Sequence, residues 1–241
     1  MCTVILLLRP GHAWPVLIAA NRDERIDRAW DPPAAYWPDR PGTVAGRDRS
    51  GGGTWMAMRG GLVAAVLNRP GSLGPAPGKA SRGALPLAAV DAASADSAAA
   101  AMLRTDGGIY RSFNMVIADR HGAHFLRGLG RGRIDGWRLP PGLHVVTAHD
   151  PNDPASPRAT AHLPRFAAAA APDPAAGDWS AWSALLADSS GPPGAALTVP
   201  PTDGFGTVCA SFIGLAALGP PVWLFAAGPA GRAPFRPVAA S

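Results

Sequence analysis

Residues 1–24 read MCTVILLLRPGHAWPVLIAANRDE, and this stretch carries the strongest structural signal in the chain. Two apolar runs, residues 3–8 and 15–20, flank a short segment that contains proline and glycine, which is typical of two strands joined by a turn. The polar residues 21–24 end the second run, where side chains can point into a pocket. The sequence therefore predicts a strand pair with Cys2 at one end and a polar cluster at the other.

The position of Cys2 suggests a chemical role. If Met1 is removed, Cys2 carries a thiol and a free α-amine on one residue, and its small size permits that removal. An α-amino group has a pKa near ~7.7 to 8 and a thiol near ~8.5, so both lie close to neutral pH. Such a pair is a nucleophile with its own base. We therefore expect the mature protein to begin at Cys2.

Further apolar runs extend the pattern beyond the first strand pair. A helical region within residues 81–104 should start near Pro86, because proline is tolerated only in the first turn of a helix. The other expected strands span residues 53–58, 62–67, 113–120, 123–128, 143–148, 207–215 and 221–228, and the other expected helices span 159–170 and 178–188. Without a repeat or long linker, this pattern predicts one α+β domain over residues 1–241, with helices packed outside the sheets.

Composition limits the partners of the chain. The 241 residues are 47% hydrophobic, which suffices for a sizeable core, and the net charge is +5. The densest basic stretch, RGLGRGR at residues 127–133, has no interleaved aromatic residues for base stacking, so we expect an exposed hairpin and no nucleic-acid partner. No apolar run approaches the ~20 residues of a transmembrane helix. Two cysteines without a signal peptide favour a cytoplasmic location.

Two other motifs give no cofactor site. Lys79 follows a glycine as in a phosphate-binding loop, but Leu73 replaces the first glycine and Ala80 replaces the magnesium-binding Ser or Thr. The six histidines show no metal-site spacing with cysteine or carboxylate residues. We expect neither a metal nor another cofactor.

Several stretches together point to a family. Cys2, AANRDE (residues 19–24), GRDRSGGGTWMAMRGGLVAAVLNRPG (46–71) and SRG (81–83) resemble the NRDE family, also called the Transport and Golgi organisation 2 family. The resemblance is dense over residues 1–85 and returns at HDPNDPASPR (149–158) and GFGTVCAS (204–211). The family resembles the cysteine-type N-terminal nucleophile (Ntn) hydrolases, which include penicillin V acylase and bile salt hydrolase. This resemblance implies a four-layer αββα sandwich.

The resemblance also implies catalytic roles. Cys2 would be the nucleophile, Asp23 would orient its amine, and Asn68 would donate to the oxyanion. The alternative for Asn68 is to cap the turn before Pro70. Acylases carry an arginine at the position of Ala20; Arg22, two residues later on the same strand face, could replace it and lower the pKa of the Cys2 thiol.

Other positions would bind substrate or depart from the pattern. The expected substrate-binding residues are Asn21, Trp55 and His149, and Trp55 would be a core or pocket-wall residue rather than a catalytic one. Acylases have a second asparagine where this chain has Ala148 and His149. Val208 replaces a late arginine of the family pattern, and Cys209 is expected to be a small core residue.

Two functions follow from these residues. The first is a cysteine amidohydrolase that cleaves a linear amide or related acyl bond of a small-molecule substrate. The second is a non-catalytic carrier of haem, a lipid or an acyl group on the same fold, because fold does not fix function. A third alternative is a structural protein in which Cys2 is simply buried.

Overall fold

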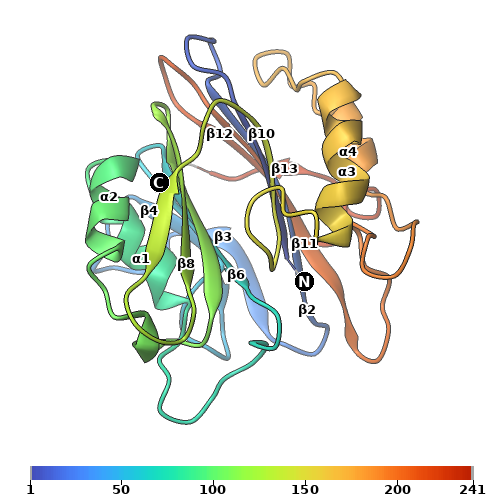
Figure 1. The fold of residues 1–241 in the computed structure, drawn as a ribbon. Helices are drawn as coiled ribbons and strands as arrows, with labels where there is room; N and C mark the ends of the chain where they lie inside the picture. Colours follow the sequence, from blue (N-terminus) through green and yellow to red (C-terminus); the bar gives the residue numbers. More distant parts are fainter. Residues whose placement is uncertain (1, 240–241) are drawn as a thin grey trace. The chain divides into compact units, whose positions relative to one another are not determined.

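The computed structural model describes residues 2–239, and the chain divides into two compact units. The first unit contains the N-terminal residues up to Asp27 together with residues 141–238, and the second contains residues 28–140. Figure 1 shows the elements of both. The expected single domain over residues 1–241 stays a prediction.

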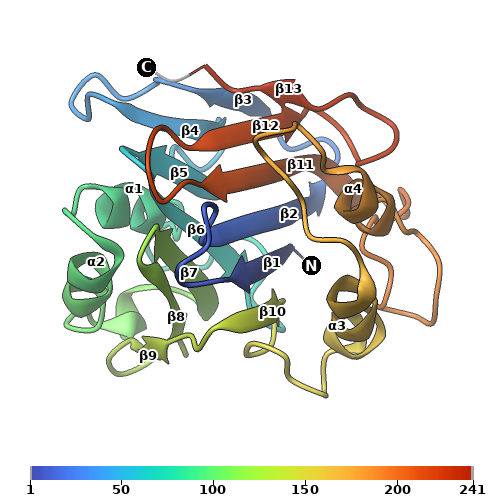
Figure 2. The ribbon, with the colours of Figure 1, turned by 90° about the horizontal axis from the view of Figure 1, so that it is seen from above.

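The first unit contains a six-stranded antiparallel sheet in the order β10-β1-β2-β11-β12-β13 (Figure 2). Its strands are β1 (Thr3–Leu8), β2 (Val16–Arg25), β10 (Gly142–Val146), β11 (Phe205–Leu215), β12 (Val222–Ala226) and β13 (Arg236–Pro237). Thr3 lies opposite Asn21, and Asn21 lies opposite Ala210. This register brings the beginning and the end of the sequence into one sheet.

Two helices, α3 (Pro157–Ala168) and α4 (Ser180–Leu186), pack on one face of this sheet. The core between the helices and the sheet contains Leu17 and Phe212 from the sheet and Phe166 and Trp182 from the helices. The rings of Phe166 and Trp182 meet edge to face, with centroids 5.2 Å apart. Alternate residues of β2 therefore face the helices, as the period of a strand requires.

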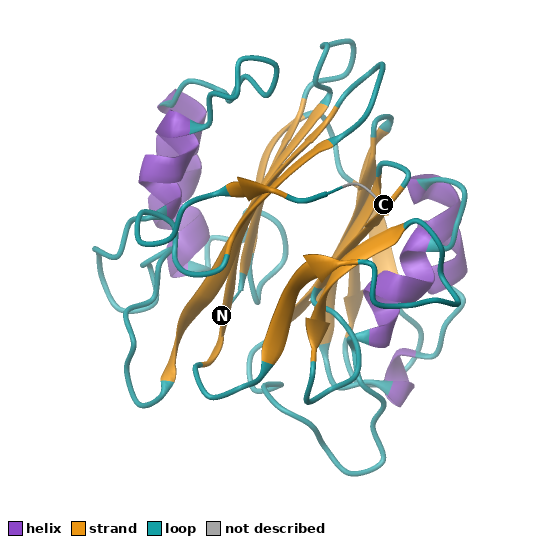
Figure 3. Cartoon of the chain, turned by 180° about the vertical axis from the view of Figure 1, so that it is seen from behind, coloured by secondary structure: helices purple, strands orange, loops and turns teal. Residues whose placement is uncertain are grey.

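The second unit contains a seven-stranded antiparallel sheet in the order β3-β4-β5-β6-β7-β8-β9. Its strands are β3 (Trp30–Ala34), β4 (Thr43–Asp48), β5 (Met56–Arg59), β6 (Leu62–Asn68), β7 (Phe113–Asp119), β8 (Gly122–Gly128) and β9 (Asp135–Arg138). Helices α1 (Ala84–Val90) and α2 (Ala95–Met102) cover one side of the sheet (Figure 3), and η1 (Gly107–Ile109) is a single 3₁₀ turn. The core between helices and sheet includes Leu85, Phe113 and Met115.

Most expected elements are present, but the structure divides one of them and adds the strands β3, β4, β9 and β13, which were not expected. The helical region expected within residues 81–104 is two helices, because Ser94 caps α2 and exchanges hydrogen bonds with Ser97 in a capping box. β3 was not expected because it holds Pro32 and Pro33, which a strand tolerates when it lies at the edge of a sheet, as β3 does.

No helix within residues 2–239 combines the length and the apolar character needed to cross a bilayer. Among these residues, no group of three or more His, Cys, Asp or Glu side chains is arranged to hold a metal ion.

Candidate active site

The register of β1 and β2 places Cys2 beside the polar end of β2. Thr3 pairs with Asn21, so the preceding residue, Cys2, lies next to Arg22 and Asp23. The half-buried Cys2 donates its thiol hydrogen to the backbone oxygen of Asp23, with an Sγ to O distance of 3.6 Å. The prediction that residues 21–24 end the second strand is confirmed, because β2 continues through them to Arg25.

The Asp23 carboxylate is fully buried and held from two other elements. Its Oδ2 lies 2.8 Å from Nη1 of Arg158, and the exposed fractions of the two side chains are 0% and 3%. Its Oδ1 accepts a hydrogen bond of 2.6 Å from the Thr207 hydroxyl. Arg158 also donates to the Thr3 hydroxyl at 2.8 Å. The cation and the hydrogen bond compensate part of the hydration that the buried carboxylate loses.

The start of α3 fixes the position of Arg158. Ser156 is the N-cap, and its hydroxyl accepts a hydrogen bond from the backbone N–H of Ala159. Pro157 occupies the first helical position, where its missing N–H costs nothing. Thr147, just after β10, exchanges a 3.0 Å hydrogen bond with the Ser156 hydroxyl. The helix therefore begins against the sheet, with Arg158 in its first turn.

A β-bulge in β11 fixes the position of Thr207. Thr207 lies opposite Asp23, whereas Cys209 lies opposite Arg22, so Val208 is an extra residue in β11. In a regular strand, residues 207 and 209 would share one face. The bulge instead places Thr207 on the face of Asp23 and Cys209 on the face of Arg22. Val208, where the family pattern has an arginine, is therefore the residue that the bulge inserts.

The pKa of the Cys2 thiol is raised, first by burial and second by the negative charge of Asp23. Arg22, which is buried and lies 3.7 Å from a carboxylate oxygen of Glu24, lowers the pKa of Cys2 but contributes least. The expectation that Arg22 would produce a net decrease in this pKa is therefore wrong. Burial also raises the pKa of Cys209, which is 1% exposed, and its prediction as a core residue is confirmed.

Asn21 joins β2 to the helix side of the first unit. Its amide nitrogen donates to the backbone oxygens of Leu186 at 3.2 Å and Leu197 at 2.9 Å. Its Oδ1 is buried without a hydrogen-bond partner within residues 2–239. Both amide hydrogens are thus engaged inside the unit, and the role of Asn21 in substrate binding stays a prediction.

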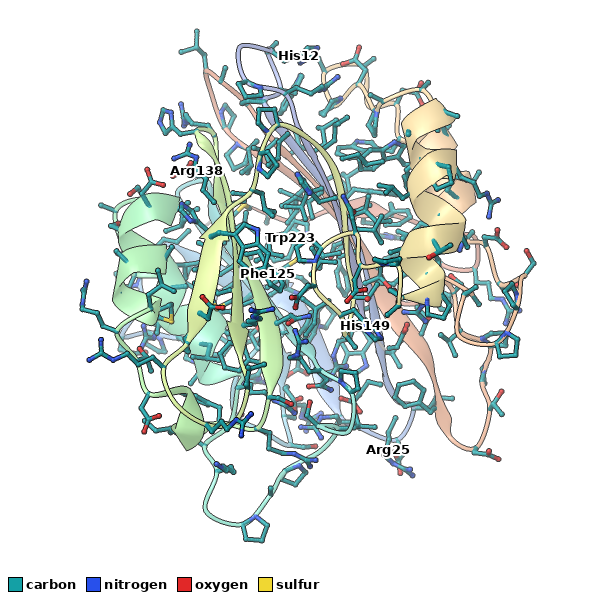
Figure 4. The ribbon with its side chains drawn as sticks, in the orientation of Figure 1. His12, Arg25, Phe125, Arg138, His149 and Trp223 are labelled. Atoms are coloured by element: carbon teal, nitrogen blue, oxygen red, sulfur yellow. The ribbon has the colours of Figure 1, made fainter. Side chains whose placement is uncertain are left out.

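His149 lies in the loop between β10 and α3 (Figure 4). Its side chain is 26% exposed, and Nδ1 lies 3.8 Å from a carboxylate oxygen of Asp153. Its backbone N–H donates to the Thr147 hydroxyl at 3.2 Å, while the neighbouring Ala148 is fully buried. Of Ala148 and His149, only the His149 imidazole is therefore exposed enough to contact a substrate.

Asn68 and Trp55 belong to the second unit. Asn68 is the last residue of β6, and its half-buried side chain makes no hydrogen bond to any described residue. The turn after it is closed by Ser72, whose N–H and hydroxyl both donate to the Arg69 oxygen. The role of Asn68, as a donor to the oxyanion or as the cap of this turn, stays a prediction.

Trp55 packs on its own sheet. Its ring lies over Gly46 of β4, where an added Cβ would come within 2.3 Å of the ring. It also meets Trp30 of β3 edge to face, with centroids 5.8 Å apart. Trp55 is half-buried, as expected of a wall or core residue.

Arg158 and Thr207 were not predicted as site residues. Both lie in stretches that carry the resemblance, since Arg158 ends HDPNDPASPR and Thr207 is the fourth residue of GFGTVCAS. A buried aspartate needs a cation, so the arginine of the first stretch was the available signal.

Comparison with known proteins agrees with the sequence resemblance. The model of the family described as Transport and Golgi organisation 2 matches residues 1–171. The chain belongs to this family. The match includes Cys2, Asp23, Asn68 and Arg158, whereas Thr207 lies beyond it. A comparison with curated proteins finds no match for this Transport and Golgi organisation 2 family member.

A solved structure shares the fold of this family member. The Caenorhabditis elegans N-acylethanolamine-hydrolyzing acid amidase (NAAA) ortholog aligns with a TM-score of 0.56 and 12% sequence identity, covering 88% of this chain and 92% of that chain. Together with the two antiparallel sheets, the likeness confirms the prediction of an α+β, Ntn-hydrolase-like fold.

Proposed function

We propose that this protein is a cysteine amidohydrolase that cleaves a linear amide or related acyl bond of a small molecule, with Cys2 as the N-terminal nucleophile. The observation that carries the proposal is the hydrogen bond from the Cys2 thiol to the backbone oxygen of Asp23, whose carboxylate is held by Arg158 and Thr207. A structural cysteine needs no such group beside it. The family and the fold of the solved neighbour support the same reaction class.

The proposed reaction has two steps. The α-amine of mature Cys2 takes the thiol proton while Sγ attacks the acyl carbon. The tetrahedral intermediate collapses, the carbon–nitrogen bond breaks, and the α-ammonium returns its proton to the leaving amine. Water then attacks the thioester, with the same amine as base, and releases the carboxylic acid and the free thiol.

The raised pKa of Cys2 explains why this mechanism needs a base. At neutral pH a thiol with a raised pKa is mostly protonated, so attack requires that its proton be removed. The α-amine of Cys2 is attached to the same residue and has the required pKa near neutrality. Asp23 would orient this amine and stabilise its protonated form.

Met1 lies outside the described residues, and its removal is part of the proposal. While Met1 is attached, the nitrogen of Cys2 is a peptide nitrogen and cannot accept a proton. The proposal therefore requires a mature chain that begins at Cys2.

The remaining roles are proposed from the family resemblance. Asn68 would donate to the oxyanion, and its unengaged amide supports that role. Removal of an oxyanion donor lowers kcat by ~10² to 10³ with little change in KM. The Arg22 guanidinium would stabilise the negative charge of the Cys2 thiolate. The substrate would be contacted by Asn21, Trp55 and His149.

One observation favours the alternative function, a carrier of haem, a lipid or an acyl group. A half-buried thiol with a raised pKa is less reactive than a free cysteine, and a carrier needs no nucleophile. This alternative predicts binding without turnover.

The test combines intact-mass spectrometry with a panel of acyl amides and esters that includes an N-acylethanolamine. The wild-type chain should lack Met1, cleave at least one compound and show a transient acyl adduct on Cys2. Cys2→Ala should abolish turnover, whereas the matched control Cys209→Ala should retain it, because Cys209 is a buried core residue. Fully retained Met1, or ligand binding without cleavage that is equal in wild type and Cys2→Ala, would support the carrier instead.

A further inference from the structure

We infer that one end of the seven-stranded sheet is a docking surface for an anionic phospholipid bilayer. This basic end consists of three connections, residues 69–83 between β6 and α1, 103–112 between α2 and β7, and 129–134 between β8 and β9. In Figure 1 the loop after β6 and the short helix η1 lie at the same lower end of their unit. The inference does not depend on the proposed hydrolase activity.

Hydrogen bonds join the three connections into one surface. Lys79 Nζ donates to the backbone oxygens of Gly108 and Gly130, and thus links all three. The N–H of Ala80 donates to the Ile109 oxygen at 2.9 Å, and the N–H of Gly107 donates to the Gly132 oxygen at 2.7 Å. The three connections are therefore held close together.

The positive charge of the chain is concentrated on this surface. The three connections hold seven basic residues and one acidic residue, Asp106, for a formal charge of +6. The basic residues are Arg69, Lys79, Arg82, Arg104, Arg111, Arg131 and Arg133. Because the whole chain has a net charge of +5, all its other residues together carry −1. The preference for an anionic partner is thus local to the basic end.

Three aliphatic side chains project among these charges. Leu73, Ile109 and Leu129 are 48%, 46% and 50% exposed, and one lies in each connection. They are half of the six large hydrophobic residues that the described part of the chain exposes. Aliphatic residues surrounded by Arg and Lys fit a bilayer interface, where apolar groups enter the acyl region and cations bind the headgroups.

The cations are placed so that their charge remains effective. Arg111 donates to the backbone oxygens of Gly71, Leu73 and Pro75, which fixes the loop without neutralising the guanidinium. Arg131 and Arg133 are exposed and have no ion-pair partner within residues 2–239. A bilayer would therefore meet a loop that is fixed by hydrogen bonds, together with two exposed arginines.

The same features argue against a nucleic acid as the partner. Proteins that bind single-stranded RNA stack bases on exposed aromatic rings. The one aromatic residue of the basic end, Tyr110, is half-buried, and its ring meets Phe113 edge to face with centroids 6.0 Å apart. The exposed apolar residues are aliphatic, which suits acyl chains rather than bases.

The charge test measures co-sedimentation of the full chain with vesicles of phosphatidylcholine alone or of equal parts phosphatidylcholine and phosphatidylglycerol. Wild type should bind only the anionic vesicles. Each basic residue near such a surface strengthens binding about five-fold, so Arg131→Glu with Arg133→Glu should weaken it at least about twenty-fold. Arg232→Glu with Arg236→Glu is the matched control, because both arginines are exposed in the other unit and the net charge changes equally.

The apolar test uses substitutions that leave the charge unchanged. Leu73→Ser with Leu129→Ser should weaken binding to the anionic vesicles about ten-fold or more, whereas Leu218→Ser, at a residue 90% exposed in the other unit, should not. Thermal unfolding of each variant checks that the fold is intact. Equal losses in test and control variants, equal binding to both vesicle types, or displacement from vesicles by a single-stranded RNA oligonucleotide at equal charge concentration would overturn the inference.

Discussion

At the scale of single residues, the central feature is the fully buried Asp23 carboxylate, which is paired with a cation. Arg158 supplies the compensating charge, and Thr207 supplies a hydrogen bond. Removing one member of a buried ion pair leaves the other charge without compensation, which is more costly than removing both. Arg158 therefore positions Asp23 and does not itself need to contact a substrate.

The first prediction concerns this pair. Arg158→Ala should lower the free energy of unfolding by about 3 to 5 kcal/mol, because the Asp23 carboxylate would stay buried without its cation. Arg158→Lys should recover part of the loss, since an ammonium keeps the charge but not the two-way contact with Asp23 and Thr3. Guanidinium-induced unfolding measures both.

Arg165→Ala is the matched control in the same helix, because Arg165 is 45% exposed and pairs with Asp188 near the surface. Its loss should cost no more than about 1 kcal/mol. If Arg158→Ala were no more destabilising than Arg165→Ala, the Asp23 carboxylate would not depend on Arg158.

The second prediction concerns the thiol. Because burial and the charge of Asp23 both raise the pKa of Cys2, its alkylation by iodoacetamide should increase with pH to a midpoint above the usual thiol value of ~8.5. Asp23→Asn removes the second cause, so the midpoint should shift to lower pH and labelling at pH 7 should be several-fold faster. Peptide mapping measures Cys2 against Cys209 as an internal control, and an unchanged midpoint would contradict the assigned cause.

At the scale of secondary-structure elements, apolar periodicity predicted the central strands well. The bounds of β1 match the expected residues, and β2 and β6 extend the expected runs by a few residues. The bulge in β11 could not be predicted, because a period of two residues does not show where one extra residue is inserted. The side-chain directions of Thr207 and Cys209 therefore became clear only from the register with β2.

Helix α3 carries a further titratable group, His162, which is buried. Its Nε2 donates to the Ala195 oxygen at 2.9 Å, and its Nδ1 accepts a hydrogen bond from Arg165, so the ring is neutral. Burial lowers the pKa of His162, with smaller contributions in the same direction from Arg165 and Arg158. Protonation would thus place a charge between α3 and the loop that contains Ala195.

The third prediction is that the free energy of unfolding decreases as the pH is lowered, because His162 binds a proton more readily in the unfolded chain than in the folded one. The unfolded chain binds this proton below pH ~6.5 and the folded chain only at lower pH, so the stabilisation present above ~6.5 is lost as pH decreases between the two pKa values. The slope from this one group is at most about 1.4 kcal/mol per pH unit. His162→Gln should reduce the slope of unfolding free energy between pH 6.5 and 5, and the exposed His121→Gln should not. Equal slopes in both variants would contradict the prediction.

At the scale of the whole molecule, the chain order explains what the sequence could and could not predict. Residues near Cys2 were predictable because β1 and β2 are consecutive and the family motif includes both. Asp23 and Thr207 are 184 residues apart in sequence, and no spacing rule connects them. Arg158 enters from α3 in the same way, so only the folded sheet brings these three residues together.

The fourth prediction follows from the same chain order. β2 is bonded along its whole length by β11, so a chain that ends at residue 204 would lack β11–β13 and expose the edge of β2 together with Leu17. Such an edge favours aggregation, and we expect this chain to be insoluble or unfolded by circular dichroism.

The control is a chain that ends at Phe235. Of the strands, it loses only the two-residue β13, and it keeps the contact of Phe235 with Phe212, whose ring centroids are 4.4 Å apart. It should unfold within a few degrees of the full chain. A soluble, native-like product from the 204-residue chain would contradict the pairing of β2 with β11, and with it the placement of Thr207 on Asp23.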